Sequence, residues 1–295
     1  MMKRRKKKTC QISLTQVIIS VIMISIFILP FWIIFVSSVS ENSQLQANGI
    51  SLWFQGYSMD GYKFIFQMSK TFMHSLWFSV WTSFSSAFLS AAVCILAAYA
   101  LSQKCFVGRK FLNFFVMFTM FFSGGQIPTY LVIRGLGLYD TAFALILPGV
   151  ASAYNIMLAR NYFYGIPQSL DEAARLDGAS DFQILMKVYF PLSKTVSFTI
   201  FFMTFVAKWN QWLPSLLYVG AQNQKLWTVQ YVLNQIINDA QAIFGNAAGG
   251  GSVSTMPLIS ATNAATIMVV LPLIIIAPLV QRFFVHGATD GSVKE

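Results

Sequence analysis

The chain has 295 residues, of which 56% are hydrophobic and only 10% are charged, whereas a soluble domain carries about 25% charged residues. This composition excludes an ordinary soluble domain and predicts an all-α membrane protein. The net charge of +10 does not indicate nucleic-acid binding, because the basic residues lie between apolar runs rather than on one face with interleaved aromatic residues.

The first apolar run follows six consecutive cations at residues 3–8, which we expect to remain in the cytoplasm. Residues 17–37 then supply about the 20 apolar residues that cross a bilayer core. A cleavable signal peptide is the alternative, because small residues follow at 38–40, but the apolar core of a signal peptide has only about 7–15 residues. We therefore expect an uncleaved first span and an external loop at 38–70.

Five further apolar runs predict five more spans. They are expected at residues 75–101, 111–131, 142–162, 196–219 and 264–284. The second is rich in Ser and Ala, which allow close helix packing, and Gly124, Gly125 and Pro128 should loosen the outer end of the third. With both termini in the cytoplasm, 15 of the 20 Lys and Arg residues fall on the inner side and four on the outer side. This distribution follows the positive-inside rule and supports six spans.

The outer segment 220–262 is the longest connection between two predicted spans. Apolar residues recur in it at helical spacing and predict an amphipathic helix over 226–243. Residues 245–254, with three consecutive glycines from Gly249, are expected to be flexible. One interpretation is that this segment simply caps the bundle of spans.

The most distinctive stretch is residues 169–192, SLDEAARLDGASDFQILMKVYFPL, a polar island between two apolar runs. Ser169 followed by Glu172 predicts a capping box at the start of a short helix. Gly178 can adopt the left-handed conformation that ends such a helix. The pattern therefore predicts a helix that begins at Ser169 and stops at Gly178.

A second short helix is predicted directly after this glycine. Ser180 and Gln183 repeat the capping signature, and Pro191 should close the helix. Its expected apolar side is formed by Phe182, Leu185, Met186 and Tyr189. The helix pair either lies on the lipid surface as an amphipathic element or fits into a groove of another protein. The small Ala173 and Ala174 beside the bulky Phe182 favour the groove.

The run Glu172-Ala173-Ala174, with Gly178, Ile184 and Pro191-Leu192 at their spacings, resembles the EAA loop of permease subunits in bacterial ATP-binding-cassette (ABC) importers. The resemblance implies the type I ABC importer permease fold. It also implies that the loop is a coupling helix, which docks in a cleft of the ATPase subunit. The residues implied in ATPase coupling are Ser169, Leu170, Asp171, Glu172, Ala173, Ala174, Arg175, Asp177, Gly178, Ala179 and Phe182.

Two other stretches resemble the permeases of carbohydrate uptake, namely Trp209-Asn210 with Trp212-Leu213-Pro214, and the C-terminal residues 284–287 and 291–294. In the maltose and multiple-sugar systems such a chain is the second of two permease subunits. The resemblance implies a multi-pass protein of the bacterial cell membrane. Its implied partners are a homologous permease, two ATPase subunits and an extracellular solute-binding protein, which meets the outer segment 220–262.

This resemblance divides the chain into an N-terminal part at 1–70, a permease core at 71–285 and a cytoplasmic tail at 286–295. The core contains the coupling loop at 165–195 and the external loop at 220–262. The maltose-type relatives usually have an uncharged residue near Lys208 and a shorter outer loop. Both departures fit a branch that handles longer oligosaccharides.

No enzyme site is evident in the sequence. The phosphate-binding pattern Gly-x-x-x-x-Gly-Lys-Ser/Thr is absent, so ATP and Mg²⁺ are expected on partner subunits and no cofactor on this chain. The two histidines, His74 and His286, and the three scattered cysteines, Cys10, Cys94 and Cys105, predict neither a metal cluster nor a disulfide framework.

The fifth predicted span contains the most unusual charge, Lys208. A charged residue within a span is costly and normally faces the bundle interior or water. At helical spacing it shares a face with hydrogen-bonding groups and an indole ring, which suit a sugar. The predicted substrate path comprises Thr204, Lys208, Asn210, Gln211, Trp212 and Ser215. The alternative is that Lys208 extends to the membrane interface or pairs with a backbone carbonyl.

Two other functional classes remain compatible with these patterns. One is an ABC permease for a solute other than a sugar, such as an amino acid or phosphate. The other is a membrane regulator or assembly factor that conducts no substrate.

Overall fold

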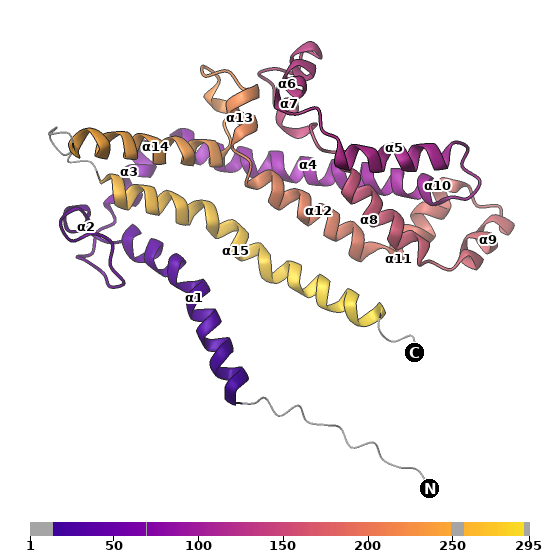
Figure 1. The fold of residues 1–295 in the computed structure, drawn as a ribbon, viewed down its shortest axis with the longest axis horizontal. Coiled ribbons are helices and arrows are strands. Elements are labelled where there is room, and N and C mark those ends of the chain that lie inside the picture. Colours follow the sequence, from indigo (N-terminus) through magenta and orange to yellow (C-terminus); the bar gives the residue numbers. More distant parts are fainter. Residues whose placement is uncertain (1–13, 69, 249–256, 292–295) are drawn as a thin grey trace, which may run out of the picture. The chain divides into compact units, whose positions relative to one another are not determined.

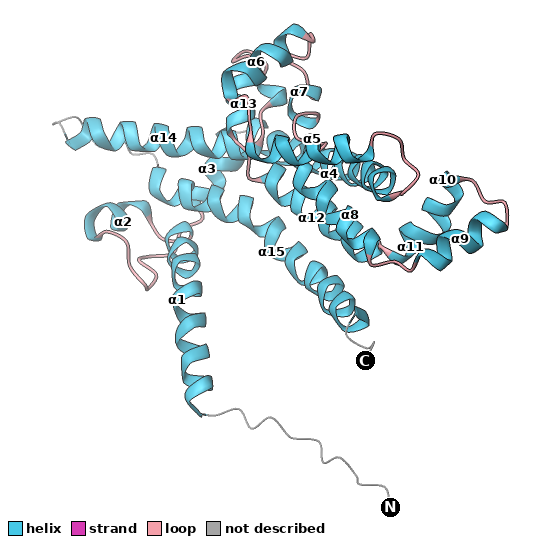
Figure 2. Ribbon diagram, turned by 45° about the vertical axis from the view of Figure 1, so that its right-hand side comes forward, coloured by secondary structure: helices cyan, strands magenta, loops and turns pink. Residues whose placement is uncertain are grey.

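The computed structural model describes residues 14–68, 70–248 and 257–291, and these are helical without a strand (Figures 1 and 2). The described residues belong to two compact units. The first unit takes its residues from Met1–Met68 and Ala240–Ile267, and the second from Ser69–Asp239 and Met268–Glu295. The prediction of an all-α membrane protein is confirmed.

Three helices are long and apolar enough to cross a membrane, and they match the first, second and sixth predicted spans. They are α1 (Leu14–Ser38), α4 (Lys70–Ser102) and α15 (Leu258–Gly291). Two bent helix pairs also pass the test, so the described residues contain up to five spans by length and composition. The helix α15 continues through most of the predicted tail, to Gly291.

The third predicted span is not one continuous helix. Helix α5 (Arg109–Phe121) and helix α6 (Gln126–Gly135) are bent by 118° relative to each other. Gly125 at the junction has a φ of +86°, a value that residues with a side chain rarely adopt. The single helix expected over 111–131 was therefore wrong, because the Gly124-Gly125 pair interrupts the span instead of only loosening its end.

The fourth predicted span, 142–162, is also divided. Helix α7 (Phe143–Ile146) and helix α8 (Ala153–Tyr164) are separated by a turn that contains Pro148 and Gly149, and Gly149 has a φ of +81°. The Ser152 side chain then accepts a hydrogen bond from the Asn155 amide and caps α8. This short helix is not among those long enough to span alone, so a continuous span here was a wrong expectation.

The fifth predicted span, 196–219, breaks near its outer end. Helix α12 (Lys194–Trp209) stops before Asn210, and helix α13 (Leu213–Tyr218) begins with Pro214 in its first turn. Proline cannot donate a backbone hydrogen bond, so a helix start tolerates it better than a helix interior. The Trp212-Leu213-Pro214 run therefore starts a new helix.

The centre of the second unit is α4, which packs against α8 and α12. Figures 1 and 2 show these helices side by side. The buried face of α4 consists largely of small residues: Ser75, Ser79, Ser83, Ser86, Ala87, Ser90, Cys94 and Ala98. Small side chains let two backbones approach closely, so the close packing predicted for this span is confirmed.

The amphipathic helix expected in the segment 220–262 is present as α14 (Val229–Ala248), after a 3₁₀ turn at Gln224–Leu226. Its apolar stripe is buried at Val229, Val232 and Leu233. Residues 245–248, which we expected to be flexible, continue this helix. The rest of that predicted flexible segment, residues 249–254, lies outside the described residues.

The first unit contains α1, the helices α2 (Asn42–Asn48) and α3 (Asp60–Met68), the last turns of α14 and the first turns of α15. The predicted external loop therefore contains two helices of its own. A side chain at Gly61 would place its Cβ 2.7 Å from the backbone of Ser260. Only glycine lets α3 approach α15 so closely.

Candidate functional site

The first helix of the predicted coupling loop begins one residue earlier than expected. Helix α9 spans Gln168–Leu176, its N-cap is Pro167, and no side chain caps it. The Pro167 backbone is extended and its carbonyl accepts the Leu170 amide at 3.2 Å. The predicted capping box of Ser169 and Glu172 was therefore wrong, because Ser169 already lies inside the first turn.

The end of α9 forms as predicted. Gly178 has a φ of +77°, the Gly178 amide donates to the Arg175 carbonyl, and the Ala179 amide donates to the Ala174 carbonyl, both at 3.0 Å. These two bonds define a Schellman motif, which needs a left-handed residue at this position. The reversal therefore depends on the backbone freedom of Gly178.

The second half of the loop has the predicted cap but a different course. Ser180 and Gln183 form a capping box at the start of α10 (Asp181–Ile184). A π-helical turn, Leu185–Tyr189, then leads into α11 (Phe190–Leu192). The helical segment ends at Leu192, one residue after Pro191, and the chain turns by 82° there. The predicted end of the helix at Pro191 is therefore confirmed to within one residue, since proline disfavours continuation of a helix.

The buried face of this second half is rotated from the one that we expected. Ile184, Leu185 and Tyr189 are buried, whereas Phe182 and Met186 are exposed. The Tyr189 ring lies 5.0 Å from the ring of Tyr99 in α4 and 5.3 Å from that of Phe163 in α8. The four expected residues therefore do not share one face, since Ile184 replaces Phe182 in the contact with the helices behind the loop.

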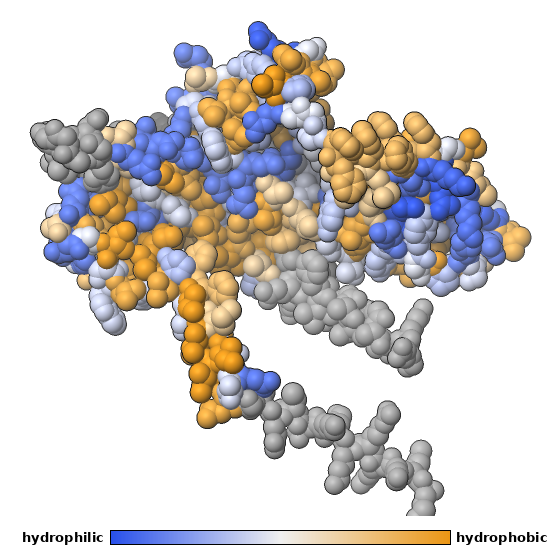
Figure 3. All heavy atoms as spheres, viewed as in Figure 1, coloured by the Kyte–Doolittle hydropathy of each residue, from blue (hydrophilic) through white to orange (hydrophobic). Residues whose placement is uncertain are grey.

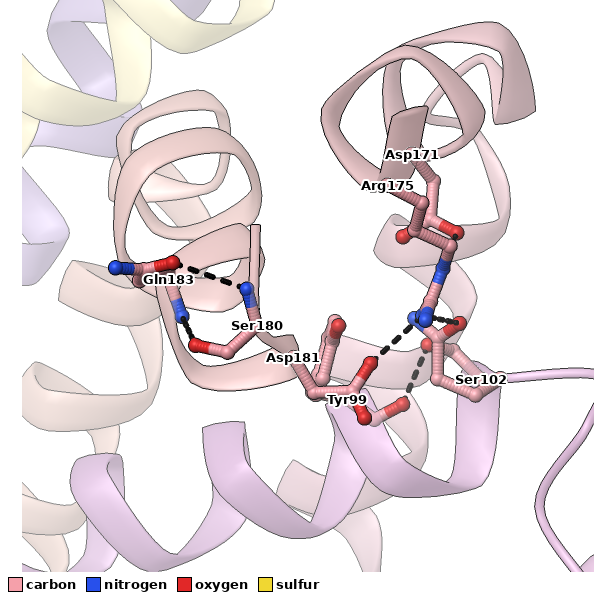
Figure 4. Close-up of polar contacts among 8 residues, drawn as sticks. Tyr99, Ser102, Asp171, Arg175, Ser180, Asp181 and Gln183 are labelled. Atoms are coloured by element: carbon pink, nitrogen blue, oxygen red, sulfur yellow. Dashed lines mark hydrogen bonds and ion pairs between the residues drawn. The ribbon is translucent and has the colours of Figure 1, made fainter. Parts of the chain in front are cut away.

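A single arginine holds the two halves of the loop together (Figure 4). The Arg175 guanidinium donates to Asp171 at 2.9 Å, one turn away, and lies 2.8 Å from the Asp181 carboxylate. It also donates to the Gln103 side chain beyond α4, at 3.4 Å. Asp171 first and then Asp181 raise the pKa of Arg175 above its ordinary value, so the clamp stays charged. None of these three contacts of Arg175 was predicted from the sequence; the i,i+4 spacing of Asp171 and Arg175 could have signalled the first, but no local pattern signals Gln103 or Asp181.

The side chains predicted for ATPase contact lie mostly on the surface. Helix α9 has no buried residue, and Leu176 and Phe182 are 89% and 64% exposed. Ala174 and Ala179 are the exceptions, since both are partly buried against the apolar cluster behind the loop. The exposed residues are Ser169, Leu170, Glu172, Ala173, Arg175, Asp177, Gly178 and Phe182, while Asp171 is half-buried. This arrangement presents an exposed helix on a well-packed support.

The polar stripe of α12 satisfies most of its hydrogen bonds within the chain. The Lys208 ammonium donates to the carbonyls of Leu145 and Pro148 at 2.8 and 2.7 Å. The Thr204 hydroxyl accepts from Asn155 at 3.2 Å and donates to Ser90 at 3.3 Å. Lys208 therefore pairs with backbone carbonyls, the alternative left open above.

The remaining members of the stripe surround the break between α12 and α13. Ser215 is buried and shares a 2.9 Å hydrogen bond with Thr228, whereas Asn210, Gln211 and Trp212 are exposed. Lys208 and Gln211 line a cavity of only about 10 Å³, roughly the space of one water molecule. In this conformation the stripe encloses no sugar-sized space.

Among the described residues, no group of His, Cys, Asp and Glu is arranged to hold a metal ion. The exposed α9 and its clamp are suited to contact with another protein.

Comparison with known proteins places these features in one context. Residues 13–289 match the family of binding-protein-dependent transport system inner membrane components. The chain is 35% identical to the polygalacturonan/rhamnogalacturonan transport system permease protein YtcP of Bacillus subtilis, over 91% of this chain and 93% of that protein. It is 30% identical to the sn-glycerol-3-phosphate transport system permease protein UgpE of Brucella abortus, covering 92% and 94%.

A solved structure shares both the fold and the sequence pattern. It is a chain of a bacterial ABC transporter involved in the import of the acidic polysaccharide alginate. The similarity has a TM-score of 0.80 and 30% identity, over 92% of this chain and 95% of the other.

Proposed function

The chain belongs to the family of binding-protein-dependent transport system inner membrane components, and from this membership we propose that it is a permease subunit of an ATP-driven carbohydrate importer. It is a multi-pass protein of the cell membrane. Its partners in the proposal are a homologous second permease, two ATPase subunits and an extracellular solute-binding protein. ATP and Mg²⁺ bind to the ATPases, and this chain binds no cofactor.

The observation that carries the proposal is the exposed helix α9 on a rigid support. Movement of a docked ATPase would push on Leu176 and its neighbours. The Arg175 clamp connects α9 to Asp181 and Gln103, and the buried Tyr189 connects the loop to α4 and α8. Such a firmly packed element transmits displacement, because packed interfaces shift between discrete arrangements rather than deform continuously.

The proposed topology has six crossings and both termini in the cytoplasm. The bent pair α5 and α6, the pair α7 and α8, and the pair α12 and α13 would each supply one of the three remaining crossings. The coupling loop then lies on the cytoplasmic side, where the ATPases bind ATP.

The proposed cargo is an acidic oligosaccharide. Two of the similar proteins are a permease of polygalacturonan/rhamnogalacturonan transport and a chain of a transporter that is involved in the import of an acidic polysaccharide. In the proposal, the exposed Asn210, Gln211 and Trp212 line the substrate path, since amide groups bond sugar hydroxyls and an indole stacks on a sugar ring. Thr204, Lys208 and Ser215 position this segment through their internal hydrogen bonds.

The test is transport by the assembled complex in proteoliposomes with its binding protein. Acidic oligosaccharides should stimulate ATP hydrolysis and enter the vesicles, whereas neutral oligosaccharides of equal length should not. Uptake of neutral sugars alone would contradict the acidic cargo and leave the sugar permease intact.

A different solute is favoured by one observation, the similarity to a permease of sn-glycerol-3-phosphate transport. The same assay distinguishes it, because glycerol phosphate and no oligosaccharide would then stimulate ATP hydrolysis. A regulatory subunit that conducts nothing would show no solute-dependent stimulation at all.

A further inference from the structure

A basic groove lies beside the coupling loop, within the second unit. It has a volume of about 840 Å³ and is formed by the segment after α4, the first turns of α5 and the side of α8. Four cations line it, namely Lys104, Arg109, Lys110 and Arg160, and none of its lining residues is acidic. The groove therefore presents a concentrated positive charge.

Two of these cations converge on one neutral group. The guanidiniums of Arg109 and Arg160 both donate to the Tyr164 hydroxyl, at 2.7 and 2.8 Å. Among the described residues, the ion pairs involve only Lys63 and Arg175 as cations. Two like charges held at one phenol repel each other, and an anion between them would remove this repulsion.

A further polar group in the lining has an unused hydrogen-bonding position. Asn113 is 9% exposed, and its Oδ1 has no hydrogen-bond partner among the described residues. A buried amide without a partner is costly. If the Asn113 amide turned towards the groove that it lines, a ligand hydroxyl beside a negative charge would satisfy it.

The outer part of the groove is apolar. Phe111, Phe114 and Met117 follow the two cations at the start of α5 and are 69%, 67% and 47% exposed. Figure 3 shows α5 as a hydrophobic surface next to a strongly hydrophilic one. Along the helix, charge is therefore followed by a stripe of large apolar side chains.

A phospholipid has the same order of charge and apolar surface, with a phosphate followed by acyl chains. A small soluble anion would match the arginines but leave the phenylalanines uncovered. Basic pockets between membrane helices on the cytoplasmic side are suited to anionic head groups. The order of residues along α5 favours a lipid over a free anion.

We propose that this groove binds an anionic phospholipid of the inner leaflet. The phosphate lies between Arg109 and Arg160, the polar head group meets Asn113, and the acyl chains follow Phe111, Phe114 and Met117. Lys104 donates to Gln168 at the start of α9 at 2.7 Å, so the groove lies next to the coupling loop. Its place in the inner leaflet therefore rests on the proposed topology, in which this loop is cytoplasmic. The lipid would therefore stabilise the base of the coupling loop.

The experiment uses the assembled transporter in phosphatidylcholine nanodiscs that contain a trace of photoactivatable phosphatidylglycerol. Cross-linked peptides are mapped by mass spectrometry. The phosphatidylglycerol probe should label residues 103–117 at least about fivefold more than a matching phosphatidylcholine probe, given the attraction of each cation to anionic lipid. The double variant Arg109→Gln/Arg160→Gln should reduce this labelling to the phosphatidylcholine level.

The matched control is Lys194→Gln, which removes one exposed cation at the start of α12 and should leave the labelling unchanged. If the double variant does not assemble, Lys110→Gln replaces it and should lower the labelling partially. Equal labelling by both probes, or displacement of the lipid by inorganic phosphate, would overturn the proposal. The side of the membrane on which α9 lies is measured separately, by maleimide labelling of a Leu176→Cys variant in vesicles. A wrong topology is thereby distinguished from missing lipid selectivity.

Discussion

The proposed coupling loop and the polar stripe of α12 are both polar insertions in an apolar chain, but they use their polar groups in opposite ways. The loop leaves α9 entirely without buried residues. The stripe turns Lys208 and Thr204 inward, where they bond to carbonyls and hydroxyls of other helices. Within a membrane a broken helix must satisfy its backbone internally. A polar residue there therefore stabilises the structure before it is available to a ligand.

The largest effect is expected from Gly178→Val, which tests whether the loop is a rigid lever. A β-branched residue in the left-handed region costs about 1–2 kcal/mol or more. There is open space around a Cβ at this site, so the strain comes from the backbone alone. We expect transport to fall by about tenfold or more while ATP hydrolysis continues, measured together in proteoliposomes.

The control is Gly178→Asn, because asparagine tolerates the left-handed conformation. It should retain most of the coupling. Wild-type transport in the valine variant would show that the reversal is not needed for force transmission.

Lys208→Met tests the other region. It removes the donor to two carbonyls, and an unsatisfied buried group costs about 1–3 kcal/mol. We expect a clear fall in the thermal unfolding temperature of the purified complex. Gln211→Ala, at an exposed neighbour, should leave that temperature unchanged and lower only transport. If Lys208→Met kept its thermal stability and lost transport, Lys208 would act on the substrate instead.

A smaller effect is expected from Arg175→Gln. Its side chain is 44% exposed, and exposed ion pairs contribute only about 0–1 kcal/mol, so stability should change little. The loss of the link to Asp181 and Gln103 should reduce transport per ATP by roughly two- to fivefold. Arg175→Lys keeps the charge without the forked geometry, and its transport per ATP should lie between the values of the wild type and of the Gln variant. If the Gln variant transported as much substrate per ATP as the wild type, the Arg175 clamp would have no role in coupling.

The smallest effect is expected from two serines at the starts of the loop helices, Ser169 and Ser180. Ser180→Ala removes an observed N-cap and should cost about 1 kcal/mol of local helix stability. Ser169→Ala should cost almost nothing, since Ser169 caps no helix. Hydrogen exchange of the loop amides measures both. Equal effects would indicate that the caps do not control the order of this segment.

The sequence predicted the loop well where local rules apply. The Gly178 reversal and the Ser180 cap depend on residues within a few positions of each other. The start at Gln168 was missed because Pro167 provides an extended residue just before the helix. The contacts of Arg175 with Gln103 and of Tyr189 with Tyr99 join distant segments, and no local pattern encodes such contacts.

The spans show the same limit. Continuous apolar runs predicted α1, α4 and α15, but the breaks at Gly125, Gly149 and Asn210 divided the others. The mean hydropathy of a span hardly changes when two of its residues form a turn. The same turn, however, interrupts the backbone hydrogen bonds of the helix and divides it. The role of Lys208 was likewise open, because its carbonyl partners lie some 60 residues away.

The central claim is that α9 faces the cytoplasm and contacts the ATPase. It is tested by Leu176→Cys, at an 89% exposed position, in a chain whose native cysteines are replaced by serine. The measurement is labelling by a membrane-impermeant maleimide in inside-out vesicles, with Val107→Cys, 91% exposed, as the control on the loop after α4. We predict that bound ATPase blocks labelling at position 176 and leaves position 107 reactive. Labelling of position 176 only from the outer side, or equally with and without the ATPase, would contradict the account.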